Sequence, residues 1–524
     1  MSGLELVVVL LVVAAGLAVV ADRLGVPYPL LLVAGGLALA FVPGLPRVAI
    51  EPQLVLVIFL PPLLFSAAWF TSWRDFAANR RSIALLAIGL VVVTTTAVAA
   101  VAHHWVADMA WPTAFVLGAI VSPPDAVAAT AVLQRLKVPR RVVTIVEGES
   151  LVNDATGLVA YKLALMAATT GAVSTAWAAE QFALVAVGGV AFGLAVGWAV
   201  AQIHRRLDDF QVEIAITILT PYAVYIPAEH LGVSGVLATV AAGGYLGWHN
   251  PQLLSALTRF RGVGTWSVLL LLFNGLVFIL IGLQLATIRD IEVGPALLGE
   301  AALVSAAAIA ARLVYVPLSS YLPRFLSPRL RARDPYPPWR AVAVVAWTGM
   351  RGIVSLALAL ALPFVLPDGT PFPQRDAVIV LSFAVIFATL VVQGLSLPWL
   401  IRGLGIERDD SDLREEREAL IEASRAALAR LDEIDNTVVI HPLLLERVRA
   451  GYEERLERLT AEVRDDPECR LTEGESAAYH RLRAEALAAE RRAAVNLRNQ
   501  GRLSEDVLSR VQEALDLEAL QPDR

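Results

Sequence analysis

The sequence predicts an all-α membrane protein with a polar helical tail, and three observations carry this prediction. Hydrophobic residues make up 57% of the 524 positions and charged residues only 18%, whereas soluble domains average about 45–50% and about 25%. Long apolar runs recur through the first three quarters of the chain. The segment from Glu407 to Arg524 carries 29 acidic and 19 basic residues, and the preceding part carries 20 and 24. A single soluble globule is therefore excluded, and the single cysteine, Cys469, excludes a disulfide scaffold.

Apolar runs of about 18 residues or more indicate membrane-spanning helices, because about 20 residues at 1.5 Å each cross the hydrocarbon layer. The sequence predicts 13 such spans in a transmembrane domain of residues 1–404, followed by a cytoplasmic helical domain of residues 405–524. The spans are expected at residues 4–22, 28–42, 52–70, 83–104, 112–134, 143–168, 181–203, 211–228, 231–248, 265–287, 294–318, 341–364 and 377–401.

Basic residues in the loops between these spans indicate the orientation of the chain. Alternate loops hold 17 arginine and lysine residues, among them Arg74, Lys137 and Arg324, and the other loops hold only three. Cytoplasmic loops are enriched in basic residues, so we expect a multi-pass protein of the cell membrane with its N-terminus outside and its C-terminus in the cytoplasm. We expect no nucleic-acid partner, because no basic stripe is present.

Several charged side chains lie inside the predicted spans. A charge at mid-membrane costs about 2.5–3.5 kcal/mol, so such residues are functional candidates. The depth of each residue follows from its distance along the helix, at about 1.5 Å per residue from the cytoplasmic end of its span. By this measure Asp125, Asp154 and Arg351 lie about 14 to 17 Å deep, near the midplane. Glu149 and Arg312 both fall at about 9 Å, so we expect them to form a structural ion pair.

Three further charges, Glu147, Lys162 and Glu213, lie nearer the ends of their spans. Side chains at such positions more often snorkel to the interface or line a funnel than bind the transported ion. We therefore do not expect them to belong to the site.

Two predicted spans contain helix-breaking sequences at matching depth. The fifth contains SPPD, from Ser122 to Asp125, whose consecutive prolines remove two backbone donors. The twelfth contains TGMRG, from Thr348 to Gly352, whose two glycines permit unwinding. The breaks are seven spans apart, so one helix runs inward and the other outward, and spans 1–6 and 8–13 are expected to be inverted repeats. Paired broken helices in inverted halves are typical of the binding site of a secondary transporter.

Oxygen atoms dominate the chemistry around these breaks. Asp125 and Arg351 are expected to offset the partial charges of the broken helix ends. In the sixth span Ser150 and Asp154 are four residues apart and therefore share a face. Carboxylate, hydroxyl and freed carbonyl oxygens suit a hard monovalent cation and not a transition metal. Asp154, Asp125 and Ser150 are thus the candidate ligands of such a cation.

Five stretches of the membrane part resemble the sodium/proton exchanger branch of the monovalent cation:proton antiporters, in particular the NhaP-type bacterial members. They are FLPPLLFSAAW (Phe59–Trp69), SPPDAVAAT (Ser122–Thr130), EGESLVNDATGLV (Glu147–Val159), HLGVSGVLATVAAG (His230–Gly243) and WTGMRGIVSLALAL (Trp347–Leu360). The resemblance covers the membrane part and none of the tail. It implies a fold of 13 spans with a dimerisation domain and a mobile core domain, and hence a homodimer.

The resemblance also implies roles for individual residues. Asp154, in the pair Asn153-Asp154, would bind the cation and the proton alternately. The family's ion bridge between the sixth and eleventh spans falls on Glu149 and Arg312. Relatives with an Asn-Asp pair look electroneutral, whereas relatives with two adjacent aspartates look electrogenic.

The sequence departs from the family pattern at two places in this region. Many relatives carry an acid where this chain has Ser66, which changes the expected water-mediated coordination. Family members often have Thr-Asp or Val-Asp-Pro where this chain has Pro124-Asp125-Ala126. A ligand that is the backbone carbonyl of Pro124 survives this change, whereas a threonine hydroxyl ligand does not.

Together these patterns predict a secondary active antiporter that exchanges Na⁺, or else Li⁺ or K⁺, for H⁺ by alternating access, with a role in cytoplasmic pH and sodium homeostasis. Asn153 cannot titrate, so one acid, Asp154, exchanges one proton for one cation, which predicts electroneutral 1:1 exchange. No cofactor is expected beyond the transported ions. A cation or proton channel is the alternative. An intramembrane enzyme would need a nucleophile with a base or a metal pair, and the sequence contains neither constellation, so we expect no enzymatic activity.

The tail shows amphipathic helical patterning at residues 411–435, 442–466, 473–499 and 504–520. Thr472 and Glu475 have the spacing of a capping box at the start of the third helix. A solvated appendage without a ligand and a regulatory or dimer-stabilising domain both agree with this pattern.

Overall fold

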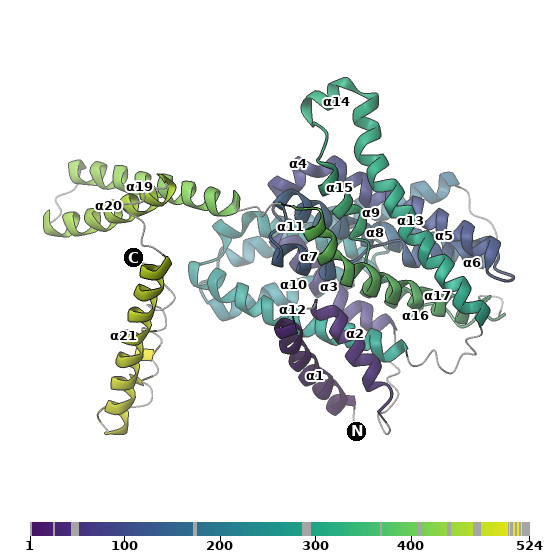
Figure 1. Cartoon of the computed structure of the whole chain (residues 1–524), viewed down its shortest axis with the longest axis horizontal. Helices are drawn as coiled ribbons and strands as arrows, with labels where there is room; N and C mark the ends of the chain where they lie inside the picture. The colour runs from purple at the N-terminus through teal and green to yellow at the C-terminus, as the bar shows by residue number, and fades with distance from the viewer. Residues whose placement is uncertain are drawn as a thin grey trace. The chain divides into compact units, whose positions relative to one another are not determined.

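A computed structural model describes residues 3–24, 27–42, 52–170, 175–285, 295–366, 369–406, 411–437, 442–464 and 473–500, and a few single positions between 502 and 515. Within these ranges the regular elements are helices, and the only β-type pairing is an isolated bridge between Val365 and Pro371. The chain divides into two compact units, Met1–Arg408 and Asp409–Arg524 (Figure 1).

The first unit holds the apolar helices. Its first part comprises α1 (Gly3–Leu24), α2 (Tyr28–Leu39), α3 (Pro52–Phe70), α4 (Trp73–Ala84), the π-helical η1 (Leu85–Leu90) and α5 (Val91–Trp105). The middle of the unit comprises α6 (Trp111–Val121), α7 (Ala126–Arg135), α8 (Arg140–Thr170), α9 (Thr175–His204), α10 (Phe210–His230), α11 (Gly235–Leu253), α12 (Ala256–Leu285) and α13 (Pro295–Leu326). The unit ends with α14 (Pro328–Arg333), α15 (Trp339–Trp347), α16 (Ile353–Leu360), α17 (Arg375–Ala388), the π-helical η3 (Thr389–Gln393) and α18 (Gly394–Gly403).

Many of these helices have the length and composition of membrane spans. Seven helical stretches among the described residues qualify: Trp73–Trp105, Trp111–Arg135, Ala183–His204, Phe210–His230, Ala256–Leu283, Ala296–Leu326 and Arg375–Gly403. Three shorter apolar helices cover Glu5–Ala21, Tyr28–Leu39 and Val57–Phe70. The chain is therefore an all-α membrane protein, while the total of 13 spans and the inverted repeat stay predictions.

The helices of the first unit pack in two groups. The scaffold group comprises α1, α2, α3 and α9 to α12, in which α2 packs along α12 and α11 packs against α3 and α9. The crossing group comprises α4 to α8, α13 and α15 to α18, in which α6 packs against α5 and α8. The main contacts between the groups run from α3, α11 and α12 to α8 and α16. This division leaves a seam between the groups, and the candidate site lies in it.

Close approach of α2 and α12 within the scaffold group depends on glycine. A Cβ atom built on Gly36 would lie 2.1 Å from the carbonyl oxygen of Ile279, and one built on Gly282 would lie 2.1 Å from that of Val33. In a membrane, helix association is driven by close packing, so small residues at a crossing let two backbones touch. Gly36 of the short second span and Gly282 of α12 therefore serve this crossing.

Both predicted breaks are present in the crossing group. α6 ends at Val121 and α7 begins after Asp125, because the two prolines between them cannot continue the helix. α15 ends at Trp347 and α16 begins at Ile353, on either side of the glycine-containing stretch. These four half-helices are the elements that position the site.

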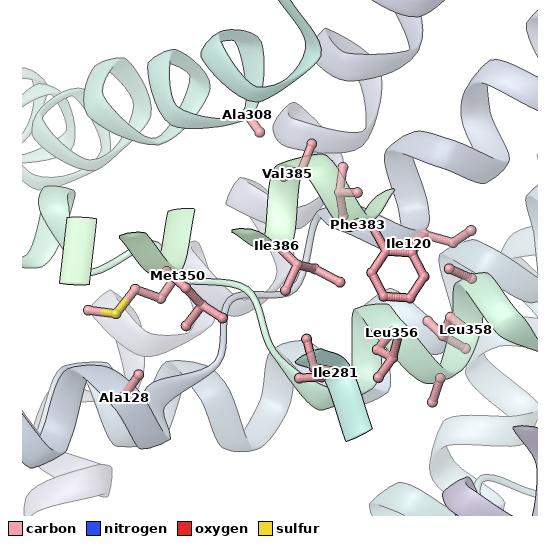
Figure 2. Close-up of a cluster of buried hydrophobic side chains, with 14 of the residues drawn as sticks. Ile120, Ala128, Ile281, Ala308, Met350, Leu356, Leu358, Phe383, Val385 and Ile386 are labelled. Atoms are coloured by element: carbon pink, nitrogen blue, oxygen red, sulfur yellow. The ribbon is translucent and has the colours of Figure 1, made fainter. Parts of the chain in front are cut away.

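Apolar packing encloses the unwound stretch between α15 and α16. Met350 in this stretch is fully buried. Figure 2 shows it in the same cluster as Phe383 and Ile386 of α17 and Leu356 and Leu358 of α16. Non-helical backbone at membrane depth is tolerated only where protein buries it or where it lines a cavity. This cluster therefore makes the second break possible.

The second unit consists of α19 (Ser411–Thr437), α20 (Pro442–Arg464) and α21 (Glu473–Asn499). α19 packs against α20, and an ion pair between Arg449 and Asp432 links them. These helices match the first three predicted tail helices to within two residues at their ends. Most of the predicted helix at 504–520 and Thr472 of the predicted capping box lie outside the described residues.

Candidate cation site

The two interrupted helices meet at their breaks. The backbone N–H of Asp125 donates a hydrogen bond of 2.7 Å to the carbonyl oxygen of Met350. A Cβ atom built on Gly352 would lie only 1.7 Å from Oδ2 of Asp125. The unwound stretches therefore cross in direct contact, and Gly352 has no room for a side chain.

Asp125 lies at the N-terminal ends of two half-helices. Its side chain accepts a hydrogen bond of 2.8 Å from the backbone N–H of Val127 and so caps α7. The same carboxylate lies against Gly352, the residue that precedes α16. Helix N-termini carry partial positive charge, so both ends favour a negative group at this point.

Arg351 lies at the opposite ends. Its Nε donates to the carbonyl oxygen of Val121, the last residue of α6, and its Nη1 donates to that of Gly349, just after α15, both at 2.5 Å. The side chain is 1% exposed, and its backbone N–H donates to Oγ1 of Thr389 in η3 at 3.1 Å. A positive group thus lies where two helix C-termini carry partial negative charge. The structure assigns the two predicted charges to opposite ends of the crossing.

Helix α8 presents Ser150 and Asp154 to this crossing. Oγ of Ser150 accepts a hydrogen bond of 3.3 Å from the backbone N–H of Ala126. Nδ2 of the fully buried Asn153 donates to the carbonyl oxygen of Pro124 at 3.1 Å. α8 is therefore joined to the first break by Ser150, one turn before Asp154, and by Asn153, next to Asp154.

A cavity of about 440 Å³ lies between the scaffold group and the crossing group. Asp125, Ser150 and Asp154 line it, together with residues of α3, α7, α12 and α16. Asp154 lies seven residues beyond Glu147 on α8, and Glu147 also lines the cavity and accepts a hydrogen bond of 3.3 Å from Gln134 near the end of α7. The cavity therefore extends from the crossing to the ends of α3 and α7 that flank the arginine-rich loops.

Two lining residues escaped the sequence analysis. Asn274 of α12 is 7% exposed and Ser355 of α16 is 1% exposed. Within the described part of the chain, Oδ1 of Asn274 and Oγ of Ser355 have no hydrogen-bond partner. A buried polar atom without a partner costs about 1–3 kcal/mol, so these oxygens are candidate contacts for an ion or its water. A single Asn or Ser in an apolar run has no charge or spacing that would single it out.

Ser66, where many relatives carry an acid, also lines the cavity. It is 2% exposed and its hydroxyl donates to the carbonyl oxygen of Leu63 at 2.9 Å. The hydroxyl oxygen keeps its acceptor capacity toward the cavity, but it brings no charge.

Glu149 and Arg312 contact each other in a bidentate ion pair. The distances are 2.5 Å from Nη1 to Oε1 and 2.8 Å from Nη2 to Oε2, and both side chains are 1% exposed. Nε and Nη2 of Arg312 also donate to the carbonyl oxygen of Val345 at 3.2 and 3.0 Å. The pair therefore joins α8 and α13 to α15, one half of the second broken helix.

The charges near the span ends lie in different environments. Lys162 pairs with Glu229 at 3.3 Å on a half-exposed surface. Glu147 lines the cavity, in agreement with a funnel position. The expectation that Glu213 snorkels or lines a funnel is wrong, because it is 1% exposed in the first turn of α10.

Comparison with known proteins decides the family. The model of the family described as "Sodium/hydrogen exchanger, transmembrane" matches residues 7–403. The chain belongs to this sodium/hydrogen exchanger family. The prediction from the sequence motifs is confirmed, and every residue of the candidate site in this exchanger lies inside the matched range.

Individual relatives agree with this assignment. An uncharacterized Na⁺/H⁺ exchanger of Mycobacterium tuberculosis is 33% identical over 99% of this exchanger and 96% of its own length. A sodium, potassium, lithium and rubidium/H⁺ antiporter of Bacillus pumilus is 33% identical over 77% of this chain and 61% of its own length. The solved structure of the sodium proton antiporter MjNhaP1 from Methanocaldococcus jannaschii has the same fold, with a TM-score of 0.62 at 19% identity over 76% of this chain and 98% of its own.

Proposed function

We propose that this exchanger is a secondary active antiporter of the cell membrane that exchanges Na⁺, or else Li⁺ or K⁺, for H⁺. The observation that carries the proposal is the cavity in which Asp154, Asp125 and Ser150 meet at the crossing of two broken helices. The relative named for sodium, potassium, lithium and rubidium supports monovalent cations as the substrate class.

Asp154 is the residue that exchanges the two ions. It lines the cavity together with Asp125 and Ser150. A cation binds the ionised carboxylate, and protonation removes the charge that holds the cation. One carboxylate that two ions cannot occupy together is sufficient for coupled exchange.

The neighbouring oxygens complete the cation site. Asp125 and Ser150 line the same cavity, and the carbonyl oxygen of Pro124 lies at the same break. Asp125 contributes a fixed negative charge, because two helix N-termini stabilise its ionised form. Asn153 holds the Pro124 carbonyl in place. An oxygen-only site of this kind matches a hard cation.

Alternating access would require the crossing group to move against the scaffold group. The cavity between them reaches toward loops rich in arginine, which the positive-inside rule assigns to the cytoplasm. The structure then corresponds to a state open to the cytoplasm. The scaffold group would provide the surface of a homodimer.

Transport in inverted vesicles tests this function against a channel. An antiporter dissipates an imposed pH gradient only when the cation is added, without a conductive shunt, and the dequenching of a pH dye reports this with sodium, lithium or potassium. A channel would pass cation or proton without the other ion and would collapse a membrane potential. Absence of any cation-dependent dequenching would reject the proposal.

A further inference from the structure

A second charged cluster lies outside the cation site. Arg81 of α4, Arg141 of α8 and Arg324 of α13 converge on one carboxylate, that of Asp334, which follows α14. Their nearest nitrogens lie 3.8, 3.0 and 2.5 Å from its oxygens. One negative charge therefore faces three positive charges, although Arg324 is 3% exposed and cannot rely on solvent.

The hydrogen bonds of this cluster are incomplete. Arg141 donates through Nε to Oδ1 of Asn79 at 3.0 Å, and all three guanidinium nitrogens of Arg324 have acceptors, on Asp334 and on the carbonyl oxygen of Ser320. Nη1 and Nη2 of Arg81 are buried and have no hydrogen-bond acceptor within the described residues. Buried guanidinium groups without acceptors are costly, so the cluster has donors available for a further anion.

A cavity of about 250 Å³ adjoins the cluster. Arg141 and Arg324 line one part of it, with Ser82, Ser319 and Ser320. The remaining wall is apolar and comes from η1, α8 and α15, through residues such as Leu86, Ile145 and Val342. A ligand that fits this cavity is an amphiphile with a negatively charged end.

We propose that this cavity binds an anionic phospholipid of the cytoplasmic leaflet. The phosphate group accepts hydrogen bonds from Arg141 and Arg324, which line the cavity and whose planar guanidinium groups suit it, and Arg81 adds positive charge beside them. The glycerol and the start of one acyl chain enter the apolar part. The arginines lie beside loops that the positive-inside rule places in the cytoplasm, where basic pockets between helices bind lipid headgroups.

The bound lipid would act on the crossing group. Val345 lines the cavity, and its carbonyl oxygen accepts two hydrogen bonds from Arg312 of the buried ion pair. The cavity is also bounded by α4, α8, α13 and α15, which all belong to that group. Occupancy would therefore stabilise these four helices against one another.

Thermal unfolding of the full-length exchanger in detergent tests the proposal. Phosphatidylglycerol is expected to raise the unfolding temperature, and phosphatidylcholine with the same acyl chains is not. The same measurement with glycerol 3-phosphate and with inorganic phosphate tests whether a soluble phosphate without acyl chains is sufficient. Equal stabilisation by either soluble phosphate, or by phosphatidylcholine, would overturn the assignment to an anionic lipid.

Variants locate the effect. In the double variant Arg81→Gln and Arg141→Gln, the phosphatidylglycerol concentration for half-maximal stabilisation is expected to rise by about tenfold or more, because charge-assisted hydrogen bonds are lost. Arg140→Gln is the matched control, since Arg140 pairs with Asp75 at 2.6 Å instead of Asp334.

A second change leaves the charges intact. Ala341→Phe adds volume to the apolar wall of the cavity and is expected to weaken the stabilisation while the arginines remain. This variant decides the question alone if the double arginine variant does not fold. Lipid adducts of the Ala341→Phe variant are also measured by native mass spectrometry. If the variant responds to the same phosphatidylglycerol concentrations as the wild type, the proposed site is wrong.

Discussion

The guanidinium of Arg351 donates a hydrogen bond of 2.5 Å to the carbonyl oxygen of Val121, so a residue of the second broken helix completes the end of the first. The backbone N–H of Asp125 makes the reverse connection to Met350. Each interrupted helix thus supplies a partner that the other lost at its break. The two breaks form one structural unit, and a change in either is expected to affect both.

Gly352→Ala is expected to abolish exchange. The added Cβ would lie 1.7 Å from Oδ2 of Asp125, which forces the two unwound stretches apart. Cation-dependent dequenching in inverted vesicles measures the loss. Gly299→Ala in α13 is the matched control, because no atom lies within 4 Å of its added Cβ, and it is expected to keep full activity and gain about 0.5–1 kcal/mol of helix stability. Equal activity of the two variants would contradict the contact.

Asp154→Asn is expected to abolish exchange while the protein still folds. The amide has the shape of the carboxylate but cannot take up a proton or balance a cation. Transport in proteoliposomes and thermal unfolding of the purified variant measure the two properties. Glu147→Gln, the same chemical change at another point of the cavity, is the control and is expected to retain exchange. Sodium/proton exchange near the wild-type rate in Asp154→Asn would show that another residue carries the proton.

Alanine at either Glu149 or Arg312 is expected to lower the free energy of unfolding by about 3–5 kcal/mol, because the remaining charge is buried without its partner. The charge-swapped double variant is expected to recover only part of the loss. Its arginine would start from α8 and could not repeat the two hydrogen bonds to the carbonyl oxygen of Val345. Denaturation curves of all three variants measure the coupling, and strictly additive losses would argue against direct pairing.

Asn274→Leu is expected to raise the cation concentration for half-maximal transport by about tenfold, the effect of losing a hydrogen-bonding oxygen near a charged group. Thermal stability is expected to change little, since the change removes a buried oxygen without a partner together with the hydrogen bond between the Asn274 amide and Tyr28. A purely structural asparagine would give the opposite pattern, with lower stability and an unchanged cation dependence.

Exchange is expected to be electroneutral. Asn153 cannot titrate, and Asp125 is held at two helix N-termini, so one acid takes up one proton for each monovalent cation. A membrane potential contributes about 2.3 kcal/mol per charge moved across 100 mV and would then leave the equilibrium ion ratio unchanged. Proteoliposomes with a potassium/valinomycin clamp measure this ratio. A shift with imposed voltage would identify Asp125 as a second proton carrier.

The features that the sequence predicted well depend on neighbours along the chain. Two consecutive prolines and a pair of glycines interrupt helices wherever the chain places them, so both breaks were visible in the residues. The spacing of Ser150 and Asp154 puts them on one face of any helix. The pairing of Glu149 with Arg312 crosses between helices, but equal depth in a membrane of known thickness was enough to anticipate it.

The sequence by itself therefore determined that the chain is a helical membrane protein of this family, where its helices break and that Ser150 and Asp154 share a helix face. Only the tertiary structure decided which helix ends Asp125 and Arg351 serve, which uncharged oxygens of α12 and α16 face the cavity, and that three arginines from three helices share Asp334. The physical reason is that backbone chemistry and helical periodicity act within a few residues, whereas the direction in which a side chain meets another helix depends on how the helices pack.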